Sequence, residues 1–128
     1  MPIPRIIVID DEEGMCWAVA RALQEEGYFV RTATSGPDGL ALVEREGADL
    51  VLLDIRMPRM SGLEVLKRIK LLHPAMPVII MTGFGSMPTA LEAIEKGAVG
   101  YITKPFNIDD LKAAVRKALA PGNHWIEC

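Results

Sequence analysis

The chain has 128 residues, with 14 Lys or Arg and 17 Asp or Glu and a net charge of −3 at pH 7, which is enough length for one domain and too little for two. The negative charge argues against direct binding of nucleic acid, because a phosphate backbone attracts clustered Lys and Arg. No apolar run approaches the roughly 18 residues of a membrane span, and no signal peptide opens the chain, so we expect a cytoplasmic protein that does not contact the membrane.

Five short apolar segments have the composition of strands in a parallel sheet. Each is rich in aliphatic or β-branched residues and ends at a turn or a polar residue. We expect these strands at residues 5–9, 28–33, 49–54, 77–82 and 99–103.

Five further segments carry apolar residues at helical spacing, and we expect helices at residues 13–26, 37–46, 62–72, 87–96 and 108–119. The clearest start signal is Ser61, which has Glu64 three residues later, the spacing of a capping box. The spacing also places Ala18, Leu72 and Leu91 on buried helix faces, and Trp17 is expected to pack inside the domain. Further start and stop signals are the capping residues Ser86 and Asn107 and the glycines Gly27, Gly47 and Gly97.

Strict alternation of strands and helices predicts a parallel sheet with right-handed crossovers and helices on both faces. The expected fold class is therefore α/β, a three-layer sandwich with five parallel strands and five helices. We expect one domain over residues 1–120. Residues 121–128 have no clear place in this pattern and are interpreted as a C-terminal tail or the start of a linker.

Polar side chains follow four of the expected strands. Asp10 and Asp11 come after the first strand, Asp54 ends the third, Thr82 ends the fourth and Lys104 comes after the fifth. Parallel strands share one carboxyl edge, where open α/β sheets bind their ligands, so these side chains are expected to converge. Each alone has an ordinary explanation as a helix cap or a solvated charge, but their combination predicts a functional site.

Three carboxylates at one edge repel one another unless cations neutralise them. A divalent cation together with Lys104 would balance Asp10, Asp11 and Asp54, and ligation by oxygen atoms favours Mg²⁺ over Zn²⁺. Such a site suits a phosphoryl group. Asp54 could act as the nucleophile and form an acyl phosphate, with Lys104 and Thr82 contacting phosphoryl oxygens.

These residues resemble the receiver domains of two-component response regulators, and the resemblance spans roughly residues 4–120. It implies the flavodoxin-like receiver fold with strand order 2-1-3-4-5. It also implies that Asp54 is the phosphoacceptor and that Mg²⁺ is held by Asp11, Asp54 and the backbone carbonyl of Arg56. Asp10 would orient the water shell of the metal ion.

The resemblance assigns roles to four more residues. Lys104 would contact the phosphoryl group and precede a cis peptide bond to Pro105. Thr82 and Tyr101 resemble a switch pair, in which the hydroxyl moves toward the phosphoryl group and the aromatic ring moves into the space that it leaves.

Two positions next to this set are expected to set the lifetime of the phosphorylated form. Gly83 leaves room for phosphodonors, while Arg56 and Phe84 flank the path of an attacking water. Phe84 cannot orient that water by a hydrogen bond, so we predict slow loss of phosphate, over many minutes or longer. A half-life of seconds in the presence of Mg²⁺ would contradict this prediction.

The resemblance also implies partners, first of all a sensor histidine kinase or a phosphotransfer protein. The stretch 81–106 is similar to receivers of ATPase-type transcription activators, in which the fourth helix, last strand and final helix mediate dimerisation. An ordinary solvated helix face remains an alternative for the charged residues. The candidate dimer contacts are Ala90, Glu92, Glu95, Lys96, Tyr101 and Lys112.

Two other interpretations compete with a receiver. Phosphatases of the haloacid dehalogenase type also place an Asp nucleophile at a strand end, but their second acid is replaced here by Arg56, so proton delivery fails. A binding module of flavodoxin-like or degenerate receiver type would lack part of the acid, hydroxyl and lysine set, and this chain has all of it. We therefore expect a switch that catalyses only its own phosphotransfer and dephosphorylation.

Overall fold

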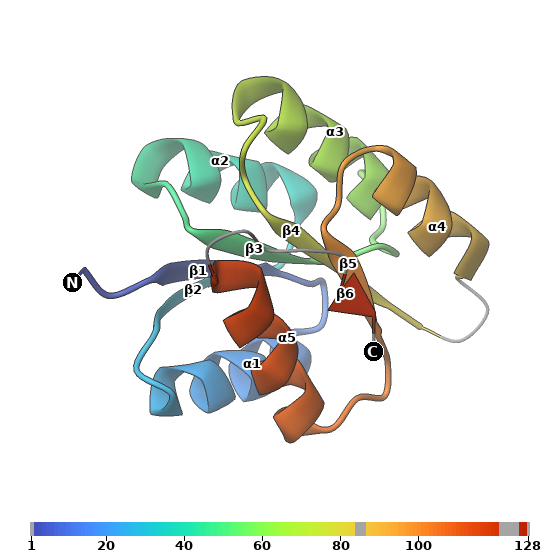
Figure 1. Cartoon of the computed structure of the whole chain (residues 1–128). Helices are drawn as coiled ribbons and strands as arrows, with labels where there is room; N and C mark the ends of the chain where they lie inside the picture. The colour runs from blue at the N-terminus through green and yellow to red at the C-terminus, as the bar shows by residue number, and fades with distance from the viewer. Residues whose placement is uncertain (1, 84–86, 121–125, 128) are drawn as a thin grey trace.

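A computed structural model describes residues 2–83 and 87–120 and the backbone of residues 126–127 (Figure 1). The alternation expected from the sequence is present, and each element begins and ends within one residue of its predicted position. The elements are β1 (Arg5–Ile9), α1 (Glu13–Glu25), β2 (Phe29–Ala33), α2 (Gly36–Glu46), β3 (Leu50–Asp54), α3 (Gly62–Leu72), β4 (Val78–Thr82), α4 (Met87–Glu95), β5 (Gly100–Thr103) and α5 (Ile108–Leu119).

With a further two-residue strand, β6 (Ile126–Glu127), the strands form one parallel sheet in the order β2-β1-β3-β4-β5-β6. This order confirms the predicted 2-1-3-4-5 arrangement of five strands. It also contains one element that the sequence did not predict, β6 (Ile126–Glu127), which pairs with β5 at one edge of the sheet (Figure 1).

Helices cover both faces of the sheet, with α2, α3 and α4 on one face and α1 and α5 on the other (Figure 1). Each strand contributes side chains to the cores on both faces of the sheet, because alternate side chains point to opposite faces. In β1, for example, Ile7 and Ile9 belong to the hydrophobic cluster beneath α2 and α3, while Ile6 and Val8 belong to the cluster beneath α1 and α5. The sheet therefore separates two hydrophobic cores and contributes side chains to both.

Three helices begin at capping residues whose side chains accept a backbone hydrogen bond. Ser61 Oγ accepts from the Glu64 N–H at 3.4 Å, and Asn107 Oδ1 accepts from the Asp110 N–H at 2.8 Å, as the sequence predicts. Ser35 caps α2 in the same way. The predicted cap Ser86 lies outside the described residues.

Four side chains that were predicted to be buried are exposed. Trp17, Leu72 and Leu91 have exposed fractions of 65%, 61% and 50%, and Ala18 is also exposed. In α1 the buried positions are taken by Cys16 and by Val19, Ala22 and Leu23, which turns Trp17 and Ala18 outward. Leu72 lies in the last turn of α3, and Leu91 lies on the outer side of α4. These predictions of burial were wrong.

Candidate functional site at the carboxyl edge of the sheet

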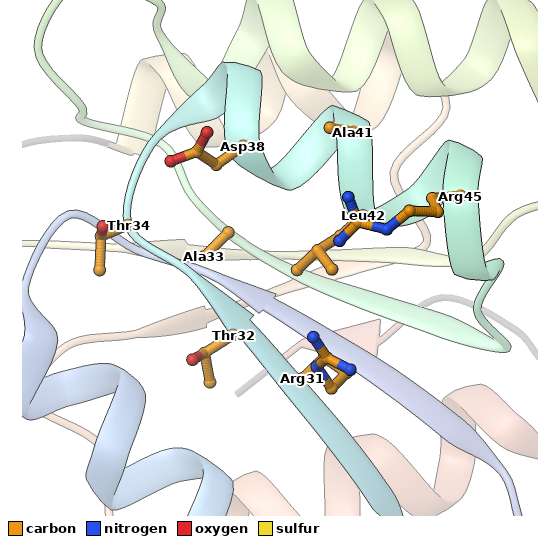
Figure 2. Close-up of a pocket in the computed structure, with 8 residues that line it drawn as sticks. All are labelled: Arg31, Thr32, Ala33, Thr34, Asp38, Ala41, Leu42 and Arg45. Carbon is orange, nitrogen blue, oxygen red and sulfur yellow. The ribbon is translucent and has the colours of Figure 1, made fainter.

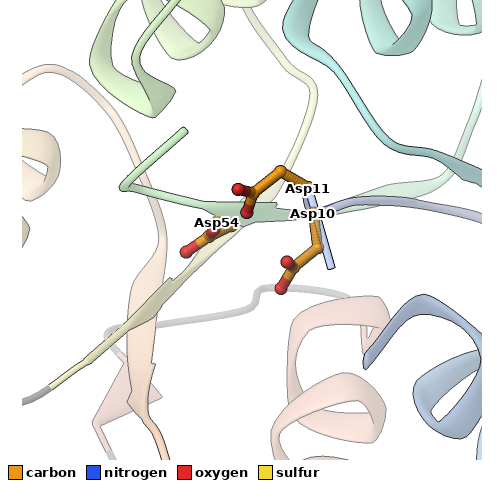
Figure 3. Close-up of side chains that lie close together, drawn as sticks. All are labelled: Asp10, Asp11 and Asp54. Carbon is orange, nitrogen blue, oxygen red and sulfur yellow. The ribbon is translucent and has the colours of Figure 1, made fainter. Parts of the chain in front are cut away.

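Three carboxylates meet where β1 and β3 end (Figure 3). One oxygen from each of Asp10, Asp11 and Asp54 lies within 4.8 Å of the other two. Asp10 is fully buried and Asp54 is 5% exposed, whereas Asp11 faces solvent. The cluster is thus anchored in the protein on one side and open to water on the other.

The position of Asp54 follows from the way β3 meets α3. All five residues of β3 are buried, so the strand is held between two helix layers up to its last residue. The Gly62 N–H then donates to the Ile55 carbonyl at 3.0 Å, and a Cβ at Gly62 would overlap the backbone of Asp54 and Ile55. Only glycine lets the start of α3 approach the strand end this closely.

Lys104 reaches the cluster from the end of β5. Its Nζ donates to Asp10 Oδ2 at 2.7 Å and lies 3.4 Å from Asp54 Oδ1. Its backbone N–H donates to the Thr82 carbonyl at 2.7 Å, which ties it to the neighbouring strand, and its peptide bond to Pro105 is cis. A cation is therefore already paired with two of the three acids.

Backbone N–H groups also point at the carboxylates. The Glu12 N–H donates to Asp10 Oδ1 at 2.9 Å, and the Arg56 N–H donates to Asp54 Oδ1 at 3.4 Å. The backbone of Arg56 therefore borders the cluster, while its side chain is exposed.

Thr82 and Tyr101 lie on the neighbouring strands β4 and β5. Thr82 is fully buried at the end of β4, with its hydroxyl 3.5 Å from the Gly83 carbonyl oxygen. Tyr101 is 8% exposed, lies opposite Ile80 and packs in the cluster that includes Ala90 of α4. Phe84, the predicted neighbour of the water path, lies outside the described residues.

The electrostatics of the cluster favour binding of an additional cation. Burial, and then the negative charge of Asp10, raise the pKa of Asp54 to about 6 from 3.8, while Lys104 and the Arg56 N–H act in the opposite direction. Burial would lower the pKa of Lys104, but its hydrogen bond to Asp10 and the two carboxylate charges raise it. Three ionised acids against one ammonium leave two negative charges, which a divalent ion would cancel.

The donor set fits Mg²⁺. Every candidate ligand is an oxygen atom, and Mg²⁺ binds oxygen while retaining several waters. The exposed Asp11 leaves one side of the cluster accessible to such waters and to a phosphoryl group. Metal ions of the softer kind would require His or Cys ligands, and Cys16 does not provide one.

Cys16 makes a contact that the sequence did not predict. Its buried thiol donates to the Asp10 carbonyl at 3.2 Å. Burial, and then the charge of Asp10, raise the pKa of the thiol to about 11, so it stays protonated at neutral pH and remains a donor. Cys16 therefore helps to hold the end of β1, a role that helical spacing alone could not indicate.

The site is distinct from a cavity of about 340 Å³ between β2 and α2 (Figure 2). That cavity is lined by Arg31, Thr32, Ala33, Thr34, Asp38, Ala41, Leu42 and Arg45. None of these is a predicted site residue, and both arginines pair with Glu46. The acid cluster lies instead at the ends of β1 and β3, with Asp10 and Asp54 buried and Asp11 exposed.

A three-layer sandwich around the parallel strands β2-β1-β3-β4-β5, with acids at the ends of β1 and β3, a hydroxyl at the end of β4 and a lysine after β5, defines a receiver-type domain. Comparison with known proteins agrees, because residues 6–116 match the model of the response regulator receiver domain. The chain belongs to this family and is a receiver domain of two-component signal transduction. Receiver domains act as phosphorylation-dependent switches and are not enzymes in the ordinary sense.

Its relatives include transcription regulators. The chain is 46% identical over 115 residues to the transcriptional regulatory protein ZraR of Salmonella typhimurium, covering 90% of this chain and 26% of ZraR. It is 42% identical over 113 residues to the DNA-binding transcriptional regulator NtrC of the same organism, covering 88% of this chain and 24% of NtrC. The chain thus spans about a quarter of the length of these curated relatives.

Solved structures show the same fold. The crystal structure of the receiver domain of NtrX from Brucella abortus superposes with a TM-score of 0.86 at 40% identity, covering 89% of this chain and 97% of that one. A receiver domain from Clostridium thermocellum gives a TM-score of 0.88 at 36% identity, covering 91% and 94%. Within the described part of the chain, no helix has the length and apolar character needed to cross a membrane.

Proposed function

We propose that this chain accepts a phosphoryl group onto Asp54 from the phosphohistidine of a sensor kinase or phosphotransfer protein. The observation that supports this most directly is the cluster of Asp10, Asp11 and Asp54, in which Lys104 pairs with Asp10 and Asp54. We propose Asp11, Asp54 and the backbone carbonyl of Arg56 as the Mg²⁺ ligands, with Asp10 acting through a water. The ion, when bound, neutralises charge on the phosphoryl oxygens.

Asp54 has the properties of a nucleophile at neutral pH. With a pKa of about 6, its carboxylate is mostly ionised at pH 7. A carboxylate oxygen forms the new bond to phosphorus as the bond from phosphorus to the kinase imidazole nitrogen breaks, and the electron pair returns to that nitrogen. Lys104, already 3.4 Å from Asp54 Oδ1, then donates to a phosphoryl oxygen and balances its charge.

The proposed output begins at Thr82 and Tyr101. Thr82 turns its hydroxyl toward the phosphoryl group, and Tyr101 fills the space that the hydroxyl leaves. This change would control dimerisation through the face of α4, β5 and α5, where the candidate contacts are Ala90, Glu92, Glu95, Lys96, Tyr101 and Lys112. In the single chain, Lys96 lies 3.9 Å from Glu92, and Lys112 lies 3.9 Å from Glu26, so both lysines would exchange these partners on dimerisation.

The proposed domain covers residues 1–120, with residues 121–128 as a tail or the start of a linker. Its partners are the kinase or phosphotransfer protein and a second copy of the chain, and it binds neither nucleic acid nor membrane directly. If this domain controls transcription, as the names of the two relatives indicate for those proteins, it would do so as part of a longer protein. We place this function in the cytoplasm.

The test is incubation with a small phosphodonor and Mg²⁺, followed by intact mass measurement. We expect one added phosphoryl group, its loss in Asp54→Asn and its retention in Asp109→Asn, which changes an exposed acid in the first turn of α5. Repeated turnover of a phosphomonoester would instead support a phosphatase. An unlabelled chain would support a binding module.

A further inference from the structure

The sheet of this chain continues past β5. In β6, Ile126 lies opposite Gly100 and Glu127 lies opposite Tyr101, in parallel register. The match to the receiver family ends at residue 116, so β6 lies beyond the part of the chain that the family accounts for. The family match therefore does not account for this pairing.

A strand at the edge of a sheet presents a row of backbone N–H and C=O groups that can pair with another extended segment. Without β6, β5 would be such an edge. The inner side of β5 is already paired with β4, where the Lys104 N–H donates to the Thr82 carbonyl and the Val99 N–H donates to the Val78 carbonyl. The outer side of β5 is the side on which β6 pairs with Gly100 and Tyr101.

Tyr101 connects this edge to the site. Its side chain packs with Ala90 and Ile80 in the cluster beneath α4, while its backbone lies between β4 and β6. A shift of the Tyr101 backbone that accompanies repacking of the ring would also disturb the pairing with β6, because Tyr101 itself is paired with Glu127. The pairing with β6 and the proposed switch therefore involve the same residue, Tyr101.

We propose that the outer edge of β5 is an interaction surface for an extended segment, that residues 126–127 of the same chain occupy it, and that they mask the α4–β5–α5 face until Tyr101 moves. This inference rests on the proposed function. The occupant is the chain's own segment because that segment is the one paired with the edge. Release of β6 frees the edge for the second copy of the chain.

Three chains test this inference: the native chain, a chain ending at Ala120, and a full-length chain with Ile126→Gly and Glu127→Gly. Each is phosphorylated with a small phosphodonor and Mg²⁺, and sedimentation equilibrium measures its dimerisation constant. We expect both altered chains to dimerise more tightly than the native chain, by about tenfold for each β6 that no longer has to be displaced. A tenfold change corresponds to ~1.4 kcal/mol, which is in the range expected for the pairing of two residues. Amide hydrogen exchange at Tyr101 should also be faster in both before phosphorylation.

The outcomes separate this inference from the proposed function. If all three chains take up phosphate at Asp54 but share one dimerisation constant, or form no dimer, the masking role of β6 is wrong and the receiver function stands. Equal protection of the Tyr101 amide in the native and altered chains would also overturn it. If no chain takes up phosphate at Asp54, the proposed function itself fails.

Discussion

Asp54 carries its charge at the end of a strand whose residues are all buried, next to a fully buried Asp10. Such a carboxylate is stable only when other groups compensate the lost hydration. Lys104 and the Arg56 N–H compensate part of it, and the raised pKa of Asp54 shows that the compensation is incomplete. The uncompensated negative charge of the cluster favours binding of a metal ion. The same negative charge makes the metal-free domain less stable at neutral pH.

The incompletely compensated charge of Asp54 predicts how the stability of the metal-free domain, measured in the presence of a chelator, depends on pH. The pKa of Asp54 is about 6 in the folded protein against 3.8 as the ordinary value, so between these values the folded state holds a proton that the unfolded state has released. The free energy of unfolding should therefore fall as pH rises from about 4 to 7, by up to about 3 kcal/mol. Urea titrations of the native chain and of Asp54→Asn measure it.

The decrease should largely disappear in Asp54→Asn and persist in Asp109→Asn, which removes an exposed carboxylate of α5. If Asp54→Asn and the native chain lose the same free energy of unfolding over this pH range, ionisation of Asp54 is not the cause of the decrease.

Asp11 is the exposed member of the cluster and should be needed for metal binding more than for folding. At a Mg²⁺ concentration about a hundred times its dissociation constant, the native chain should gain about 2.7 kcal/mol of stability. Asp11→Asn should lose most of this gain because it removes a ligand and one negative charge. Glu13→Gln, two residues further along and also exposed, should keep it. Thermal unfolding with and without Mg²⁺ provides the comparison, and an equal response of both variants would exclude Asp11 as a ligand.

At the scale of the elements, the approach of α3 to the end of β3 fixes Asp54. A Cβ at Gly62 would collide with the backbone of Asp54 and Ile55, and backbone cannot move aside as a flexible side chain can. Gly62→Ala should therefore lower the free energy of unfolding by about 1–3 kcal/mol or more. It should also slow the labelling of Asp54, because the collision displaces the nucleophile.

Gly14 provides the matched control for Gly62. It lies in the first turn of α1, and a Cβ there would meet nothing within 4 Å. Gly14→Ala should stabilise the protein by up to about 1 kcal/mol, since alanine favours the helix. Urea titrations measure both variants. Equal stability changes would show that the close approach at Gly62 does not determine the strand end.

The elements also show where prediction from the sequence succeeds. The caps at Ser61 and Asn107 act through bonds to residues three positions away, so local sequence is sufficient to predict them. The exposure of Trp17 and Leu91 depends instead on which side of the helix meets the sheet. Cys16 rather than Trp17 faces the core of this domain, and only the tertiary structure determines that choice.

At the scale of the molecule, the convergence of the strand ends was predictable because it follows from topology. A parallel sheet brings the carboxyl ends of β1, β3, β4 and β5 to one edge whatever their separation in sequence, and Lys104 meets Asp10 across 94 positions. β6 was not predictable, because two residues are too few to show a period and their pairing depends on an edge that only the assembled sheet presents.

The shared sheet also predicts that the two cores unfold together. Leu66 lies in the cluster beneath α3 and Leu23 in the cluster beneath α1, and both are fully buried. Leu66→Ala and Leu23→Ala should each cost about 2–5 kcal/mol, whereas Leu71→Ala, at a side chain that is 78% exposed, should change stability by less than about 0.5 kcal/mol. Methyl NMR of Ile79 and Ile80, which point to opposite faces of β4, should report one urea transition in every variant. If Leu23→Ala shifted the transition of Ile79 and left that of Ile80 in place, the two layers would be separate cooperative units, and a change at the strand ends could not reach both faces through the sheet.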